Sequence, residues 1–124
     1  MNLFSRKPKQ VKPPQTINAP RIDFLGEQAG PVEDDLKARF WHTFAGFPAV
    51  QRAYLARLSY GQQSGHSVGL CIRSTSGIDQ TLQKRLGQIF TETFNAREHL
   101  DILFIRDDQE QELKKVCGPF YVAV

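Results

Sequence analysis

Three histidines and two cysteines are the side chains with the widest choice of chemistry in this chain of 124 residues. His42, His66 and His99 lie far apart, and no two of them stand at the i, i+4 spacing with which histidines on one helix ligate a metal ion. Cys71 and Cys117 form neither a C-x-x-C metal pair nor a disulfide framework. The sequence therefore predicts no metal centre and no cofactor site.

Cys71 is also predicted to lie inside a strand, where a free thiol behaves as a small apolar side chain. His66 cannot activate it, because strand residues five positions apart point to opposite faces and lie well separated. We therefore predict that the protein is not an enzyme and has no catalytic residues. The alternative, an enzyme or small-ligand binder, needs a site assembled from distant residues such as His66, Asp101 and Cys117.

Two acidic groups could bind a divalent cation or carry out acid–base catalysis. They are Glu33-Asp34-Asp35 and Asp107-Asp108. Each stands at the predicted start of a helix, where carboxylates cap the chain or complement the positive end of the helix dipole. No glycine-rich phosphate-binding loop accompanies them. The sequence therefore favours a role for these acids in helix stability rather than in catalysis.

Positive charge is concentrated at the start of the chain. The formal net charge is +3, but from residue 13 onwards 12 basic residues face 13 acidic ones. Proline recurs in the basic stretch and disfavours regular structure, so we expect residues 1–20 to form a flexible, basic, proline-rich arm. The simplest interpretation of this arm is a solvated tail without a binding role. The alternative is that it binds nucleic acid or an anionic membrane electrostatically. Four side chains would carry that binding: Arg6, Lys7, Lys9 and Lys12.

Apolar periodicity predicts the elements that would position any site. A helix is expected over 31–46, because four apolar residues recur there at helical spacing. They are Leu36, Phe40, Phe44 and Phe47. Strands are expected over 50–60 and 66–73, and the short glycine-containing loop between them favours an antiparallel hairpin.

The second half of the chain predicts two more helices and one strand. Asp79 is placed to cap a helix over 79–95, in which Gly87 indicates close packing. A strand over 99–105 follows and is expected to lie parallel to the preceding strand, because a helix connects the two. A short helix begins at Asp107, with Leu113 and Val116 facing inwards.

The predicted order is α-β-β-α-β-α, an α+β fold with a small mixed sheet packed with helices. It forms one domain over residues 21–124. The third strand is apolar on both faces, which predicts either helices on both sides of the sheet or a face covered by another chain. Self-association, for example as a homodimer, therefore stays open.

Apolar runs in this sequence are short. The longest, over 120–124, has five residues, far fewer than a membrane-spanning helix needs, and no secretory apolar region follows the basic residues near Met1. We therefore expect a cytoplasmic protein with no transmembrane segment.

Several short segments, taken in order, resemble a known family. They are Phe47-Pro48-Ala49-Val50, Ala53-Tyr54-Leu55-Ala56, Val68-Gly69-Leu70, Leu86-Gly87-Gln88, His99-Leu100-Asp101-Ile102 and Pro119-Phe120-Tyr121. In this order and spacing, over about residues 31–121, they resemble the C-terminal domain of the enhanced serine sensitivity (SseB) family of bacterial proteins. The resemblance implies a bacterial protein and supplies no catalytic residues. Longer members of the family have an additional N-terminal domain, in whose place this chain has the basic arm.

The leading hypothesis is a small cytoplasmic bacterial protein that acts without catalysis, through contacts with a protein partner or with a second copy. It rests on the lack of recognisable catalytic motifs, on the two-sided apolar strand and on the family resemblance. Aromatic side chains anchor many interfaces, although for any single one of them the sequence favours core packing. Five are candidate partner contacts: Trp41, Tyr54, Tyr60, Phe120 and Tyr121.

Overall fold

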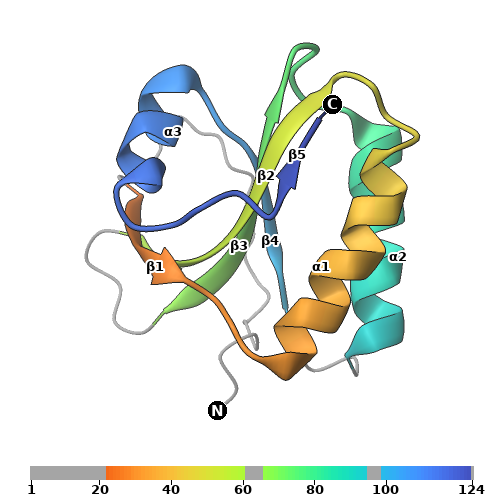
Figure 1. Ribbon diagram of the computed structural model, residues 1–124, viewed down its shortest axis with the longest axis horizontal. Helices are drawn as coiled ribbons and strands as arrows, with labels where there is room; N and C mark the ends of the chain where they lie inside the picture. Colours follow the sequence, from red (N-terminus) through yellow and green to blue (C-terminus); the bar gives the residue numbers. More distant parts are fainter. Residues whose placement is uncertain (1–21, 61–65, 95–98, 124) are drawn as a thin grey trace.

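The computed structural model describes residues 22–60, 66–94 and 99–123, which form three helices and a five-stranded mixed sheet. The elements follow one another as β1 (Asp23–Glu27), α1 (Pro31–Phe44), β2 (Val50–Ser59), β3 (Ser67–Ser74), α2 (Gln80–Thr93), β4 (Asp101–Phe104), α3 (Asp107–Lys114) and β5 (Tyr121–Val122). Figure 1 shows α1 and α2 side by side against one face of the sheet and α3 against the other. The α+β class predicted from the sequence is confirmed.

The sheet is organised around β2. One edge of β2 pairs antiparallel with β3, from Val50 opposite Ser74 to Leu58 opposite Ser67. Its other edge is shared, because β1 pairs with the second half of β2 and β5 with the first half, both antiparallel. β4 lies beyond β3 and runs parallel to it. The predicted hairpin and the predicted parallel strand are both present.

Two strands were not predicted, so the element order is longer than expected. β1 lacks a regular apolar alternation, because it contains Gly26 and its pairing with β2 shifts register between Phe24 and Gly26. β5 has two residues, too few to show any period. Both strands depend on the exposed edge of β2 for their hydrogen bonds, and this dependence is not visible in a local pattern.

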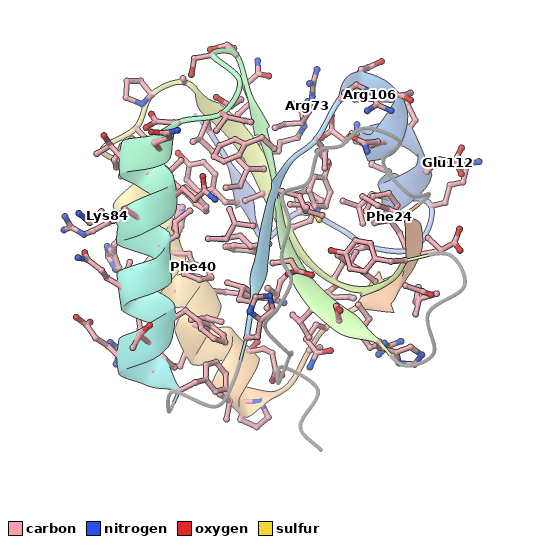
Figure 2. The ribbon with its side chains drawn as sticks, turned by 180° about the vertical axis from the view of Figure 1, so that it is seen from behind. Phe24, Phe40, Arg73, Lys84, Arg106 and Glu112 are labelled. Carbon is pink, nitrogen blue, oxygen red and sulfur yellow. The ribbon has the colours of Figure 1, made fainter. Side chains whose placement is uncertain are left out.

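The first core layer lies between the sheet and the pair α1 and α2. Three residues of each helix are buried at helical spacing: Leu36, Phe40 and Phe44 from α1, and Leu82, Leu86 and Phe90 from α2. The predicted cap of α2 is confirmed, since the Asp79 carboxylate accepts a hydrogen bond from the Leu82 N–H at 3.0 Å. Figure 2 shows Phe40 between the helices and the sheet and Lys84 on the outer side of α2.

The second core layer lies between the sheet and α3. Leu113 and Cys117 pack there against Tyr54 and Cys71. β4 contributes to both layers, with Ile102 towards α1 and α2 and Leu103 towards α3. Helices on both sides of the sheet therefore account for the two apolar faces of this strand.

Two local predictions are wrong. Val116 was expected to face inwards but is 43% exposed, because the inner side of this segment is formed by Leu113 and Cys117. Gly87 was expected to mark close packing, but a Cβ at this position would meet nothing within 4 Å. Its place in α2 is therefore not imposed by a neighbouring element.

Candidate functional site

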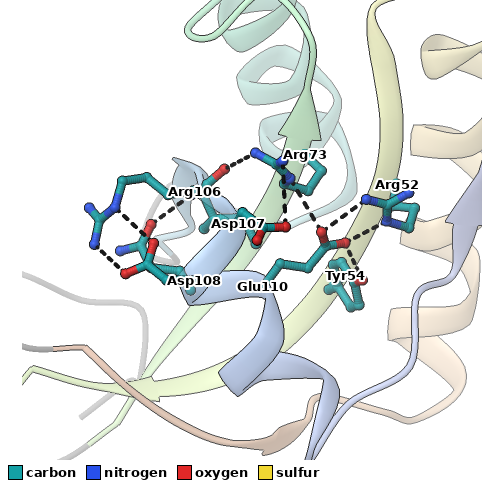
Figure 3. A network of polar contacts seen from close by, with 9 residues as sticks. Arg52, Tyr54, Arg73, Arg106, Asp107, Asp108 and Glu110 are labelled. Carbon is teal, nitrogen blue, oxygen red and sulfur yellow. Dashed lines mark hydrogen bonds and ion pairs between the residues drawn. The ribbon is translucent and has the colours of Figure 1, made fainter.

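A buried carboxylate reaches from α3 to the sheet. Glu110 is 1% exposed and accepts hydrogen bonds from Arg52 Nε at 2.5 Å, from Arg52 Nη2 at 2.9 Å and from the Tyr54 hydroxyl at 2.5 Å. Arg52 and Tyr54 lie two positions apart on β2, so both side chains leave the same face of the strand. Figure 3 shows them converging on the carboxylate.

Arg73 brings a second guanidinium to the same carboxylate. In the β2–β3 ladder it stands opposite Arg52, so two like charges face each other across neighbouring strands. Its Nε lies 3.2 Å from Glu110 Oε1, at ion-pair distance but without hydrogen-bond geometry, and its Nη1 donates to the main-chain oxygen of Ile105. The Glu110 carboxylate offsets the repulsion between the two arginines. We call Arg52, Tyr54, Arg73 and Glu110 the Glu110 cluster.

The Glu110 cluster has a fixed protonation state near neutral pH. The hydrogen bonds from Arg52 lower the pKa of Glu110 from 4.5 to about 2, although burial acts in the opposite direction. Burial raises the pKa of Tyr54 well above its ordinary value, and the hydrogen bond to Glu110 adds to the effect. The carboxylate is therefore ionised and the phenol neutral, and neither is poised to exchange a proton as a catalytic acid or base does. The geometry indicates a structural role, which is to hold α3 on the sheet.

The two acidic groups lie at the starts of α1 and α3, as expected. Glu33 accepts a hydrogen bond from the Gln28 amide at 2.7 Å. Asp108 accepts two hydrogen bonds of 3.0 Å from the Arg106 guanidinium, and these bonds lower the pKa of Asp108. Within the described residues, no three His, Cys, Asp or Glu side chains lie close enough together to hold a metal ion.

Histidines and cysteines do not come together as a nucleophilic pair among the described residues. His99 Nε2 lies 2.6 Å from one carboxylate oxygen of Asp101, and the other oxygen accepts a hydrogen bond from the Tyr60 hydroxyl at 2.6 Å. Cys117 is buried beside α3, where its thiol donates to a main-chain oxygen of β2, and burial raises its pKa to about 11. His66 is exposed just before β3. Cys117 is thus a core residue, which argues against the assembly with His66 and Asp101.

A shallow hollow lies along the flank of α1, next to the segment that leads into β5. Its volume is about 370 Å³, and it is lined by Lys37, Ala38, Trp41 and Phe120. Trp41 is 41% exposed and packs edge-on against the Tyr121 ring, with ring centres 5.4 Å apart. The Lys37 ammonium is turned to an ion pair with Glu27 at 2.8 Å, which leaves the aromatic surfaces as the main recognition element. We call this hollow the Trp41–Phe120 groove.

The five predicted contact residues have different environments. Trp41 and Phe120 lie together in the groove, and Tyr121 is largely buried behind Trp41. Tyr60 is half-buried at the Asp101 carboxylate. Tyr54 is completely buried in the Glu110 cluster and has no surface to offer a partner, so its prediction as a contact is wrong. The four charges of the predicted arm, namely Arg6, Lys7, Lys9 and Lys12, lie outside the described residues.

Sequence reasoning missed Glu110, although α3 contains a signal for it. Glu110, Leu113 and Cys117 recur at i, i+3 and i+7, and all three are buried. A carboxylate in the inward stripe of a helix needs a charged partner, because an unpaired buried charge is costly. Arg52 is such a partner, at the start of the β2 face that also carries Tyr54.

Comparison with known proteins gives no relative: no family model, no curated protein and no solved structure matches this chain. The resemblance to the SseB family therefore stays a prediction. In the described part of the chain, every helix is too short or too polar to cross a membrane.

Proposed function

We propose that this protein is a non-catalytic protein–protein interaction module that binds its partner in the Trp41–Phe120 groove. The observation that carries the proposal is the large exposed area of Trp41, which is 41% exposed although Tyr121 holds its ring edge-on at 5.4 Å. Tryptophan is strongly enriched among the residues that dominate binding energy at interfaces. A ring already fixed by its neighbour loses little rotational freedom when a partner binds.

The shape and chemistry of the groove suit one kind of occupant. Trp41 and Phe120 supply aromatic surfaces, and the small, exposed Ala38 lines the groove beside them. Grooves lined with aromatic side chains bind proline-rich segments in an extended conformation. The proposed partner is therefore a protein that places a proline, carried on an extended segment, between Trp41 and Phe120.

The Glu110 cluster supports the proposal indirectly. Its buried ion pairs hold α3 in place and offer no group for catalysis near neutral pH. Cytoplasmic location and membership of the SseB family belong to the same proposal, and both follow from the sequence patterns described above.

The test compares wild-type protein with a variant of the groove and a matched variant elsewhere. Trp41→Ala removes the anchor, whereas Ile78→Ala trims a residue that is 70% exposed just before α2. A protein captured by the wild type and by Ile78→Ala, but not by Trp41→Ala, supports the proposal. With the purified partner, calorimetry should show that Trp41→Ala weakens binding by about 30-fold or more.

A second variant blocks the groove without removing a packed side chain, so that weaker binding cannot be due to unfolding of the protein. Ala38→Glu places a charge in the groove from an exposed helix position and leaves the contact between Trp41 and Tyr121 intact. It should weaken binding while the unfolding temperature stays close to that of the wild type. If both groove variants bind the partner as tightly as Ile78→Ala does, the groove is not the contact surface.

A further inference from the structure

The Trp41–Phe120 groove lies close to the strand that follows the N-terminal arm. The end of β1 marks one side of the groove, because the Lys37 ammonium, which lines the groove, donates to the Glu27 carboxylate at 2.8 Å. Figure 1 shows β1 running from beside α3 towards the start of α1. Ile22, the first described residue, stands at the other end of β1, so a strand of five residues, about 13 Å long, separates it from Glu27.

The sequence before Ile22 contains prolines at a distance that reaches the groove. Residues 1–21 lie outside the described residues, and their sequence places Pro13-Pro14 eight and nine positions before Ile22. Eight residues in the extended proline-type conformation span about 25 Å. This length covers β1, about 13 Å, and the further turn of α1, about 6 Å, that leads from the end of β1 to Trp41. Pro20, only two positions before Ile22, is too close to it to reach the groove.

Charge beside the groove is complementary to charge on the arm. Asp34, Ala38 and Trp41 recur at i, i+4 and i+7 of α1 and are all exposed, so Asp34 extends the groove by one turn of the helix. The Asp34 carboxylate forms no ion pair with any residue in the described part of the chain. The arm has four basic residues and no acidic one, and Lys12 directly precedes Pro13-Pro14. A lysine side chain next to a proline seated at Ala38 can span the about 6 Å of helix axis to Asp34.

We propose that Pro13-Pro14 of the same chain occupies the Trp41–Phe120 groove, with Lys12 at the Asp34 carboxylate, and so competes with the partner for it. The inference rests on the proposed function, because it makes the arm an internal regulator of that binding site. A partner then binds only the fraction of molecules whose arm has left the groove. A linker of eight residues gives an effective concentration of about 1 mM, so a contact with a Kd of about 0.1 mM keeps the groove about 90% occupied.

The first experiment measures how well the arm covers Trp41 when no partner is present. Trp41 is the only tryptophan of the chain, so tryptophan fluorescence reports on the groove alone. In the full chain, the double variant Pro13→Ala/Pro14→Ala should raise the acrylamide quenching constant by about two-fold or more, because the arm no longer covers the ring. Pro20→Ala is the matched control and should be quenched like the wild type. Equal quenching of the wild type, the double variant and the control overturns the proposal.

Two further measurements test which segment occupies the groove and how it is held. Asp34→Lys places a like charge opposite Lys12 and should also raise the quenching constant; unchanged quenching would refute the contact between Lys12 and Asp34. For the wild type, the constant should not change between roughly 1 and 200 µM protein, because binding within one chain does not depend on concentration. Protection of Trp41 that develops only at the higher concentrations would mean that a second copy supplies the prolines, and would overturn docking within one chain.

Binding of the partner separates this inference from the proposed function. The partner's affinity for Pro13→Ala/Pro14→Ala should be about 10-fold higher than for the wild type, and its affinity for Pro20→Ala should equal that for the wild type. If the double variant exposes Trp41 but Trp41→Ala still captures the partner, the proposed function fails and docking of the arm stands. If Trp41→Ala loses the partner while the double variant changes neither quenching nor affinity, the groove binds the partner and the arm does not regulate it.

Discussion

Replacing Glu110 by glutamine should cost this protein about 3 kcal/mol of unfolding free energy at neutral pH. The pKa of Glu110 falls from an ordinary 4.5 to about 2 in the folded protein, and this difference corresponds to about 3 kcal/mol at 1.36 kcal/mol per pH unit. Glutamine keeps the shape but loses the charge that Arg52 and Arg73 share, and removing one partner of a buried ion pair typically costs about 3–5 kcal/mol. For a domain of this size the unfolding temperature should fall by roughly 10–20 °C.

The same contact predicts how stability depends on pH. Because the folded pKa is the lower one, the unfolded chain takes up a proton first as the pH falls. The stabilisation is therefore complete above about pH 4.5 and is lost as the pH falls towards 2, with about 2 kcal/mol of it gone by pH 3. Glu110→Gln has no carboxylate to titrate, so the difference in stability between wild type and variant should shrink over this range.

Urea unfolding at several pH values between 7 and 3 measures both effects, because urea adds no salt to screen the ion pairs. The matched control is Glu112→Gln on the same helix, whose ion pair with Lys115 is exposed and should change stability by less than about 1 kcal/mol. If Glu110→Gln proves too unstable to purify, Tyr54→Phe removes one hydrogen bond to the carboxylate and should cost about 1.5–3 kcal/mol. Equal costs for Glu110→Gln and Glu112→Gln, or parallel pH profiles for wild type and Glu110→Gln, would show that Glu110 does not stabilise the fold as argued.

Three further outcomes follow from single contacts. Asp79→Ala should lower the free energy of unfolding, measured in urea, by about 1 kcal/mol, because it removes the acceptor of the Leu82 N–H at the start of α2. The control is Asp34→Ala, because the Asp34 side chain does not cap α1. An equal or larger loss for Asp34→Ala would contradict the capping role of Asp79. Gly87→Ala should stabilise the protein by about 1 kcal/mol, since a Cβ there meets nothing. By contrast, Gly69→Ala should destabilise it by about 1–3 kcal/mol, since its Cβ would lie 2.4 Å from the Leu58 Cδ1 atom, and the opposite order of the two glycine variants would disprove the packing argument. Burial raises the pKa of Cys71 and of Cys117. At pH 8, iodoacetamide should therefore modify neither thiol in the folded protein and both thiols in urea, as measured by mass spectrometry. Rapid modification of the folded protein would mean that one thiol is accessible.

Local patterns predicted the elements whose side chains repeat with a clear period. The stripe of Leu36, Phe40 and Phe44 belongs to α1, and the β2–β3 hairpin and the Asp79 cap are where the sequence places them. These features depend on neighbours only a few residues away. β1 and β5 depend instead on the second edge of β2, so their short segments carry no period of their own.

The candidate sites also depend on contacts between residues that are far apart in the sequence. Trp41 and Phe120 could be named from residue type alone, but their meeting in one groove depends on how the segment before β5 returns past α1. Arg52 and Glu110 are 58 positions apart, so no spacing rule connects them. Their charges suggested exposure, and only their placement on inward faces of β2 and α3 reveals that they pair.

The sharing of one edge of β2 by β1 and β5 constrains the order in which the sheet can be completed. The hairpin of β2 and β3 closes a short loop and can form early. The oxygens of Gln51 and Ala53 accept hydrogen bonds from the N–H groups of Ala123 and Phe120, respectively, at 2.9 Å each, from a segment much later in the chain. During synthesis, half of this edge therefore stays uncovered until Phe120 and Ala123 have been added, and in that interval it can pair wrongly with other nascent chains.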